Sequence, residues 1–578
     1  MEHREAAYDF KLDIGNTKPD MDAGLEQLRK QRIIQRIWEH DHTVWKEKPD
    51  EITNRLGWLY SPEVMQKAIP AITAFVDDVR SKRFTHALLL GMGGSSLAPE
   101  VFRYTFGVKE GYLDLAVLDS THPSSVLSYA KTLDPQKTLY IVSTKSGGTV
   151  ETLSFMKYFY TEVLQVAGRE NAGKHFVAIT DPGSKLEETA RELKFREIFL
   201  NDPNIGGRYS ALSYFGLVPA AIIGMDLNRL LKSAEKMARR CRAATPGSEV
   251  KNPGAWLGTV MGNYAKDGRD KITLIASPGI SCFGAWVEQL IAESTGKDGK
   301  GILPVDGETI EEPQFYANDR LFVYSHLRDD SIHDQKIDEL SGSGQPVVRL
   351  NVKKVYDLGG EFFRWEFATA IAGYFLKINP FDQPNVESAK VLAREMVAAY
   401  RKEGKLPASK PIFSKGDIHI YGDDEITSLP DAFQKFFSNL NPGDEEARGR
   451  SYVSLQAYLQ PTTEINILLQ KFREKIQRKY RVATTVGYGP RFLHSTGQLH
   501  KGDGGNGLFI QLTAGCVEDA GIPDEPGGEA SSISFCVLLQ AQALGDRQAL
   551  LNENRKVLRF HFSSSPSSDL EKIIELLN

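Results

Sequence analysis

The sequence has few cysteines for its length, and they are far apart. Its 578 residues include four, at Cys241, Cys282, Cys516 and Cys536, and no two of them form a C-x-x-C pair. Disulfide-stabilised secreted proteins and cysteine-based zinc sites need more numerous or more closely spaced cysteines. We therefore expect neither a disulfide framework nor a cysteine-rich zinc site, and we expect a reducing compartment.

An excess of positive charge and long apolar runs are also missing. Lys and Arg number 70 and Asp and Glu 75, a formal net charge of −5, so there is no basic surplus for nucleic acid phosphates. The most apolar stretch, residues 214–227, is interrupted by Pro219 and is shorter than the roughly 20 residues of a membrane helix. The charged N-terminus lacks the apolar core of a signal peptide. We expect a cytosolic protein that binds neither nucleic acid nor a membrane, and only a small anion.

What is present is the composition of an ordinary globular protein, 41% hydrophobic and 25% charged. The length suggests about three to five domain-sized units, or fewer if they are large α/β layers. Apolar residues at mixed three-to-four spacing predict a helical segment over residues 1–80.

Short apolar runs begin after this segment, at residues 86–90, 115–119, 138–143 and 176–180. Segments of helix length separate them, and a turn-rich cluster follows each run. This alternation is typical of a parallel sheet covered by helices. It predicts a first α/β domain over residues 81–225.

A second block repeats this rhythm after a helix predicted at about 226–242. Its apolar runs lie at residues 272–277, 321–326 and 347–352. The fold class is therefore α/β, with two three-layer sandwiches around parallel sheets, and the second domain covers residues 226–400.

The remainder, residues 401–578, is less regular. A region rich in Pro and Gly extends to about residue 450, and helices are predicted at 466–480 and 537–551. We expect this region to complete the second domain.

A loop rich in hydroxyl groups, T-K-S-G-G-T-V-E-T at residues 144–152, joins an apolar run to a predicted helix. Such a junction offers unpaired backbone N–H groups and the positive end of the helix dipole to an anion. Because the loop has no G-K-[ST], it suits a phosphomonoester better than a nucleoside triphosphate. A capped helix start explains the same residues equally well. The hydroxyl donors are Thr144, Ser146, Thr149 and Thr152.

A glycine loop, G-M-G-G-S-S at residues 91–96, follows the preceding apolar run. In a parallel sheet both loops emerge at the same edge, where ligands bind in open α/β folds. The loop is not G-x-G-x-x-G and has no convincing acidic partner for a ribose, which argues against a dinucleotide site.

Two charged residues in the middle of the chain are candidates for chemistry. Arg208, in G-G-R-Y-S, could stabilise an oxyanion, or it could form a surface salt bridge. Glu293 ends a predicted helix in an apolar setting, with Gln289 four residues earlier on the same face. Burial would raise the pKa of Glu293 towards that of a general base, whereas a helix-end glutamate in water is the plain alternative.

Later segments add further polar candidates. Gln383 and Lys390 lie seven positions apart at the start of a predicted helix, hence on one face, although ordinary capping with a solvent-facing lysine would look the same. His494 and His500 lie in a Gly-rich segment with no third metal ligand nearby, so we expect no zinc.

Together these segments resemble glucose-6-phosphate isomerases. G-M-G-G-S-S-L-A-P-E resembles the first glycine loop of that family and S-T-K-S-G-G-T-V-E-T its phosphate loop, with G-G-R-Y-S, E-x-T-G-K and F-D-Q-x-x-V-E-x-x-K as further signatures. The similarity is closest to the isomerase half of bifunctional transaldolase–isomerase proteins, but the chain is too short for an added barrel of about 250 residues. The motifs extend from Gly91 to about Gly507, which is most of the chain.

The resemblance implies two sugar-isomerase domains and a metal- and cofactor-free interconversion of glucose 6-phosphate and fructose 6-phosphate, in glycolysis and gluconeogenesis. It implies that Glu293 transfers the proton through a cis-enediol and that Arg208 stabilises the enediolate. It also implies that His494 opens the ring, with His500 as second choice, and that Lys390 lies near the ring oxygen. Further substrate contacts are implied for Gly94, Ser95, Thr144, Lys145, Ser146, Thr149, Thr152, Gln289 and Gln383.

One departure concerns the order of the motifs. In the family the histidine motif falls between the glutamate and lysine motifs, whereas here His494 follows Lys390 by about a hundred residues. In the family this histidine comes from the partner subunit of a dimer. We expect a homodimer, with His494 supplied either by the partner or within one chain.

Two alternatives remain at this point. One is an isomerase of another phosphosugar such as mannose 6-phosphate, since pocket shape decides the sugar. The other is a non-catalytic sugar-phosphate sensor, which would need the phosphate loop but not Glu293, Arg208 and Lys390 together.

Overall fold

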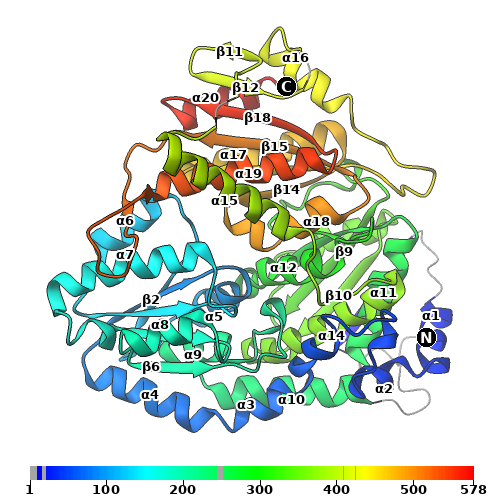
Figure 1. The fold of residues 1–578 in the computed structure, drawn as a ribbon. Helices are drawn as coiled ribbons and strands as arrows, with labels where there is room; N and C mark the ends of the chain where they lie inside the picture. Colours follow the sequence, from blue (N-terminus) through cyan, green and yellow to red (C-terminus); the bar gives the residue numbers. More distant parts are fainter. Residues whose placement is uncertain (1–8, 16–20, 244–250, 408, 424, 578) are drawn as a thin grey trace.

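The computed structural model describes residues 9–15, 21–243, 251–407, 409–423 and 425–577. Three sheets of five or six strands organise these residues. We call each sheet with its helices a unit, numbered in chain order, and the third unit lies against both others (Figure 1). The predicted α/β class with parallel sheets is confirmed.

The first sheet has the strand order β3-β2-β4-β5-β6, and all its pairings are parallel. Its central strands are continuous apolar runs because helices cover both faces. The predicted strands are confirmed, and the short β6 is an addition. The elements are β2 (His86–Gly91), α5 (Leu97–Phe106), β3 (Asp114–Leu118), α6 (Pro123–Thr132), β4 (Thr138–Ser143), α7 (Val150–Ala167), β5 (Phe176–Thr180), α8 (Lys185–Glu192) and β6 (Glu197–Leu200).

The second sheet has the order β1-β10-β9-β7-β8 and is parallel except for β1 at one edge. The prediction that the N-terminal segment is helical is therefore wrong at β1 (Phe10–Asp13). Four residues are too few to display a strand pattern, and this strand is held by tertiary contacts: Phe10 packs on Trp256 with ring centroids 4.4 Å apart. The other strands are β7 (Lys271–Ala276), β8 (Leu303–Val305), β9 (Arg320–Leu327) and β10 (Val347–Val352).

Helices pack around the first two sheets, and α10 (Leu227–Arg242) confirms the helix predicted at about 226–242. Helix α14 (Leu358–Leu376) is buried along almost its whole length. Even so, none of the helices in the described ranges is long and apolar enough to cross a membrane. The others are α1 (Met21–Lys30), α2 (Ile33–Trp38), α3 (Ser61–Gln66), α4 (Ile69–Ser81), α9 (Tyr214–Ile222), α11 (Pro253–Lys266), α12 (Phe283–Thr295) and α13 (Asp334–Gly342).

The third sheet, of order β11-β12-β18-β15-β13-β14, stands by itself. We expected residues 401–578 to complete the second domain, but their strands form this separate sheet with its own apolar core. Buried polar residues such as Gln456 and Gln511 interrupt the apolar pattern of its strands. The elements are α15 (Val386–Glu403), β11 (Phe413–Lys415), β12 (Ile418–Tyr421), α16 (Leu429–Phe437), β13 (Tyr452–Tyr458), α17 (Thr463–Tyr480), β14 (Ala483–Tyr488), α18 (Gly497–Gly502), β15 (Gly507–Ala514), α19 (Phe535–Asn552), β18 (Lys556–Phe562) and α20 (Pro566–Glu575).

The segment between β15 and α19 reaches across to the first unit. Its hairpin, β16 (Gly521–Ile522) and β17 (Ile533–Ser534), packs on α7, and Phe535 stacks on Phe155 with ring centroids 5.9 Å apart. A disulfide between Cys516 and Cys536 closes this segment. We expected no disulfide framework and did not anticipate this single disulfide, because a separation of 20 residues gives no spacing signal.

A buried ion pair fixes α18 to α19 inside the third unit. Lys501 Nζ lies 2.6 Å from Asp546 Oδ1, and both side chains are almost fully buried. Breaking such a pair from one side leaves a charge without a partner in a medium that solvates it poorly.

We predict that Lys501→Met lowers the free energy of unfolding by about 3–5 kcal/mol, because it leaves the buried Asp546 carboxylate without a partner. The double variant Lys501→Met/Asp546→Leu should recover most of this loss, since no buried charge remains. Scanning calorimetry of both proteins checks this. Equal destabilisation by the single and double variants would contradict the assigned pairing.

Candidate active site

The two predicted ligand loops lie together at the carboxyl edge of the first sheet. The glycine loop follows β2 and the hydroxyl-rich loop joins β4 to α7, as the parallel pairing of β2 and β4 requires. Thr144 Oγ1 lies 2.9 Å from Thr149 Oγ1, and the backbone N–H of Gly148 donates to Ser146 Oγ at 3.3 Å. Thr152 is fully buried, and its Oγ1 has no protein partner. The loop therefore retains a hydroxyl group without a hydrogen-bond partner.

Lys145 does not point freely into this loop. Its Nζ pairs with the Asp181 carboxylate and donates to the Pro203 carbonyl at 3.0 Å. Burial raises the pKa of Asp181, and the Lys145 ammonium opposes that rise. The lysine thus ties the loop to the end of β5, while its neighbours present the hydroxyl groups.

Arg208 is held in one orientation by the protein. Its Nε donates to Ser294 Oγ at 2.7 Å, and its Nη2 donates to the carbonyls of Pro380 and Asp382 at 2.7 and 2.9 Å. Its Nη1 lies 3.3 Å from Glu293 Oε1 and donates to Gln383 Oε1 at 3.2 Å. The structure therefore brings the predicted arginine, glutamate and glutamine together, with a buried cation beside the carboxylate.

Gln289 links this group to the histidine loop. Because Gln289 and Glu293 are one helical turn apart on α12, the amide Nε2 reaches Glu293 Oε2 at 3.1 Å. The same Nε2 donates to the backbone carbonyl of His494 at 2.7 Å. Its buried Oε1 has no protein partner, so this acceptor too is unsatisfied.

His494 pairs with a carboxylate that the sequence did not single out. Its Nε2 lies 2.9 Å from Oε1 of Glu151, in the first turn of α7. Burial would raise the pKa of Glu151, but the charge and hydrogen bond of His494, with the charge of Lys390, outweigh this and hold the pKa below its usual value. The available signal was an acidic residue within a loop otherwise rich in hydroxyl groups.

Lys390 lies at the edge of this cluster. Its side chain is 44% exposed, with Nζ 3.9 Å from Glu387 Oε2. Its charge still contributes to the lowered pKa of Glu151. The ammonium is therefore near enough to the His494–Glu151 pair to act on it electrostatically.

The glycines of the first loop allow three segments to meet. Gly93 has φ of +55°, and a Cβ there would lie 2.8 Å from Gln289 Nε2 and 3.0 Å from the His494 carbonyl. A Cβ on Gly94 would lie 2.0 Å from the Gly207 carbonyl, beside Arg208. Gly94 and the adjacent Ser95 are buried under these contacts. Side chains at these glycines would separate the loop from the arginine and histidine segments.

Part of the chain, mostly in its first half, matches a known family. Residues 65–311 match the family model described as phosphoglucose isomerase. The chain is 32% identical over 396 residues to the glucose-6-phosphate isomerase of Citrifermentans bemidjiense, covering 58% of this chain and 73% of that protein. It is 29% identical over 365 residues to the probable glucose-6-phosphate isomerase of Methanococcus maripaludis, covering 56% and 81%.

Solved structures agree on the fold. A hypothetical protein from Thermus thermophilus superposes with a TM-score of 0.59 at 24% identity, over 67% of this chain and 100% of that one. The glucose-6-phosphate isomerase of Chlamydia trachomatis superposes with a TM-score of 0.57 at 17% identity, over 67% and 88%.

This chain belongs to the glucose-6-phosphate isomerase family.

His500, the second-choice histidine, is not part of this isomerase site. It is buried in the third unit among Tyr452, Phe492 and Phe509. Burial, with the nearby Lys501 and Arg555, lowers its pKa well below the usual value. The prediction that His500 contacts substrate is therefore not met, because its ring fills a core position.

Lys297, the last residue of the E-x-T-G-K signature, belongs to the cluster although we assigned it no role. Its Nζ donates to Asp382 Oδ1 at 2.7 Å and so holds the segment that carries Gln383. Burial and the charge of Arg208 lower its pKa to about 8, against the opposing effect of Asp382.

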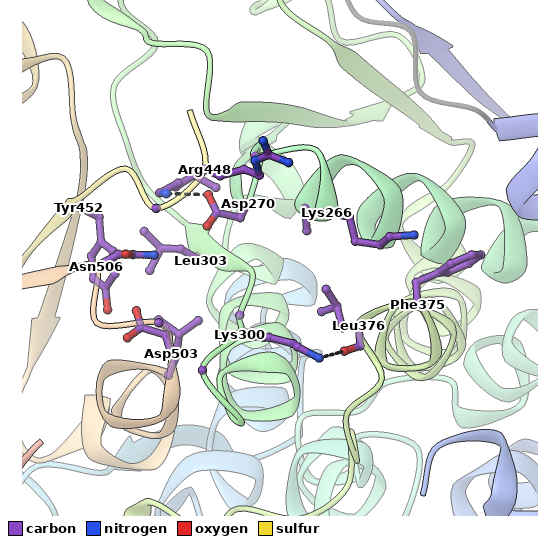
Figure 2. Close-up of a pocket in the computed structure, with 18 of the residues that line it drawn as sticks. Lys266, Asp270, Lys300, Leu303, Phe375, Leu376, Arg448, Tyr452, Asp503 and Asn506 are labelled. Atoms are coloured by element: carbon purple, nitrogen blue, oxygen red, sulfur yellow. Dashed lines mark hydrogen bonds and ion pairs between the residues drawn. The ribbon is translucent and has the colours of Figure 1, made fainter. Parts of the chain in front are cut away.

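A separate cavity of about 520 Å³ lies between the second and third units (Figure 2). Lys266, Lys300 and Arg448 are among its charged lining residues, and none of the predicted site residues lines it. In the described ranges, no three His, Cys, Asp or Glu side chains are arranged to hold a metal ion.

Glu288, next to Gln289 on α12, is a carboxyl group with a strongly altered pKa. Burial and the charge of Asp306 raise its pKa to about 8, despite Arg473 and Arg491. An acid with a higher pKa in the folded than in the unfolded state destabilises the fold as it ionises.

We therefore predict that Glu288→Gln gains stability over the wild type as pH rises from about 4.5 to about 8, by at most about 1.4 kcal/mol per pH unit. Below this window both proteins carry a neutral group and should melt alike. Calorimetry at pH 5, 7 and 9 checks this, with Glu110→Gln on the surface as control. A constant difference across pH would show that the carboxyl ionises normally.

Proposed function

We propose that this chain interconverts glucose 6-phosphate and fructose 6-phosphate, with Glu293 as the base that carries the proton between C1 and C2. Membership of the isomerase family supports the reaction. The observation that carries the residue assignment is the contact of Glu293 Oε1 with Arg208 Nη1 at 3.3 Å. A carboxylate beside a fixed guanidinium supplies both the base and the cation that an enediolate requires.

The first step is ring opening. A proton leaves the anomeric hydroxyl of the sugar and another arrives at the ring oxygen, so the pyranose becomes the open-chain aldehyde. We assign this exchange to His494, paired with Glu151, and to Lys390 beside them. An imidazole and an ammonium are groups that can accept and donate these protons near neutral pH.

The second step moves one proton between adjacent carbons. Glu293 removes the proton from C2, and the electrons of that bond form the enediolate with its negative charge on O1. Glu293 then returns the proton to C1 while the proton of the C2 hydroxyl moves to O1, so that C2 becomes the ketone. Arg208 stabilises the negative charge that develops on oxygen. C1 is reduced by two electrons and C2 is oxidised by two, so the reaction needs no external electron carrier.

The phosphate provides binding energy away from the reacting carbons. We assign its contacts to Ser146, Thr149 and Thr152 with the N-terminus of α7, and the first-loop contacts to Gly94 and Ser95. Gln289 and Gln383 remain proposed contacts of the sugar. A sensor would need only the phosphate loop. Here the Glu293–Arg208 and Glu151–His494 pairs are also present.

We predict that Glu293→Gln lowers kcat by about 10²- to 10⁴-fold, because the amide cannot accept the proton. The dissociation constant of a non-reacting sugar-phosphate analogue should change less than about threefold, since the phosphate contacts are untouched. A coupled assay from fructose 6-phosphate, run with a chelator, measures turnover. Equal loss of analogue binding would instead assign Glu293 a structural role.

We further propose that one chain holds the whole set of reacting groups. Glu151 and His494 are 2.9 Å apart within one chain, and Gln289 binds the His494 carbonyl in the same chain. The homodimer expected from the family stays a prediction, and the site does not depend on it.

Mixing two inactive variants tests this assignment. If His494 acts within its own chain, unfolding and refolding Glu293→Gln together with His494→Asn should leave less than a few per cent of wild-type activity. If the histidine came from a partner, mixed dimers would contain one intact site and recover about a quarter of it. Recovery of that size would overturn the single-chain assignment.

A further inference from the structure

A glutamine from the third unit completes the surroundings of the His494–Glu151 pair. Gln542 is on α19, is 4% exposed, and its Nε2 donates to Glu151 Oε1 at 2.7 Å. Its Oε1 accepts a hydrogen bond from Thr121 Oγ1 at 2.8 Å. Thr121 is itself fully buried, in the loop after β3. A chain of hydrogen bonds therefore runs from Thr121 through Gln542 and Glu151 to His494.

Chemistry permits only one orientation of the Gln542 amide. An ionised carboxylate accepts hydrogen bonds and donates none, so the amide must face Glu151 with its NH₂ group. The amide oxygen then faces Thr121, whose hydroxyl can donate to it. With the amide reversed, two oxygens would meet at Glu151 without a proton between them.

The same reasoning settles the proton on His494. Because Glu151 Oε1 can only accept, the imidazole Nε2 must carry a proton and donate it. Nδ1 is then the ring nitrogen that can exchange a proton with a substrate. Fixing the tautomer in this way is the usual task of a hydrogen-bonded carboxylate behind a reactive histidine.

Helix α19 is anchored well enough to hold this geometry. One turn beyond Gln542, Asp546 binds Lys501 of α18, the helix that follows His494. At Gly545 a Cβ would lie 2.7 Å from the backbone nitrogen of Ala393, so α19 packs directly on α15, the helix of Lys390. The histidine, the lysine and Gln542 are thus fixed by one scaffold.

We propose that Gln542, oriented by Thr121, is a positioning residue for ring opening: it fixes Glu151 so that His494 keeps its proton on Nε2 and offers Nδ1 to the sugar. This inference rests on the proposed isomerase function. It adds a residue of the third unit, outside the matched range 65–311, to the catalytic arrangement.

Gln542→Met in the full-length protein tests the inference, because methionine keeps the volume and loses both hydrogen bonds. We expect the rate of interconversion of the fructose 6-phosphate anomers, measured by NMR exchange spectroscopy, to fall about 10- to 100-fold. We expect kcat to fall with it and KM to stay within about twofold, since the phosphate contacts remain. Nitrogen-15 shifts of His494 should change from the Nε2-protonated form to a mixture of tautomers.

Further variants distinguish a loss of Glu151 positioning from a general loss of structure. Thr121→Val should lower the rate of anomer interconversion in part. Thr121→Ser, which keeps the hydroxyl, should have the wild-type rate. Gln548→Met makes the same change at an exposed position on α19 and should behave as wild type. Thermal melting checks that each variant is folded.

Several results would overturn the inference. One is anomer interconversion within twofold of the wild type in both Gln542→Met and Thr121→Val. Another is an unchanged nitrogen-15 spectrum, or a loss that Thr121→Ser fails to rescue. A wild-type protein without turnover of fructose 6-phosphate would instead refute the proposed function, which distinguishes the two failures.

Discussion

The hydrogen bond between His494 and Glu151 is the contact on which the rest of the arrangement depends. It joins residues 343 positions apart, one on the first unit and one on the third. Glu151 is almost fully buried, and a buried carboxylate without partners is strongly unfavourable. Docking of the third unit supplies those partners, His494 and Gln542. The same docking that forms the reactive pair therefore also supplies the buried Glu151 carboxylate with its hydrogen-bond partners.

Much of the first two units could be predicted because their strands are buried on both faces. Such strands appear as unbroken apolar runs, as at β2 and β4, and the loops after them must share one edge. The pairing of Gln289 with Glu293 followed from helical geometry alone. These features are local, or they follow from a sheet rule that needs no knowledge of distant contacts.

The third unit escaped prediction for the opposite reason. Gln456 and Gln511 are buried in its strands, so the apolar runs of these strands are broken. The pairing of Cys516 with Cys536 and the choice between His494 and His500 depend on which way a segment faces after folding. The resemblance ranked His494 before His500, and the folded surroundings separate them further, because His500 lies among aromatic rings whereas His494 pairs with Glu151.

Backbone contacts explain how a histidine so late in the chain reaches the site. A Cβ on Gly296 would lie 2.2 Å from the Leu499 Cα, and one on Gly502 would lie 2.3 Å from the Gly296 carbonyl. The turn that ends the Glu293 helix thus touches α18 without side chains between them. Main-chain packing this close sets the distance from α12 to His494 directly. The position of the imidazole is then determined by where two backbones meet, and the order of the motifs along the chain places no constraint on it.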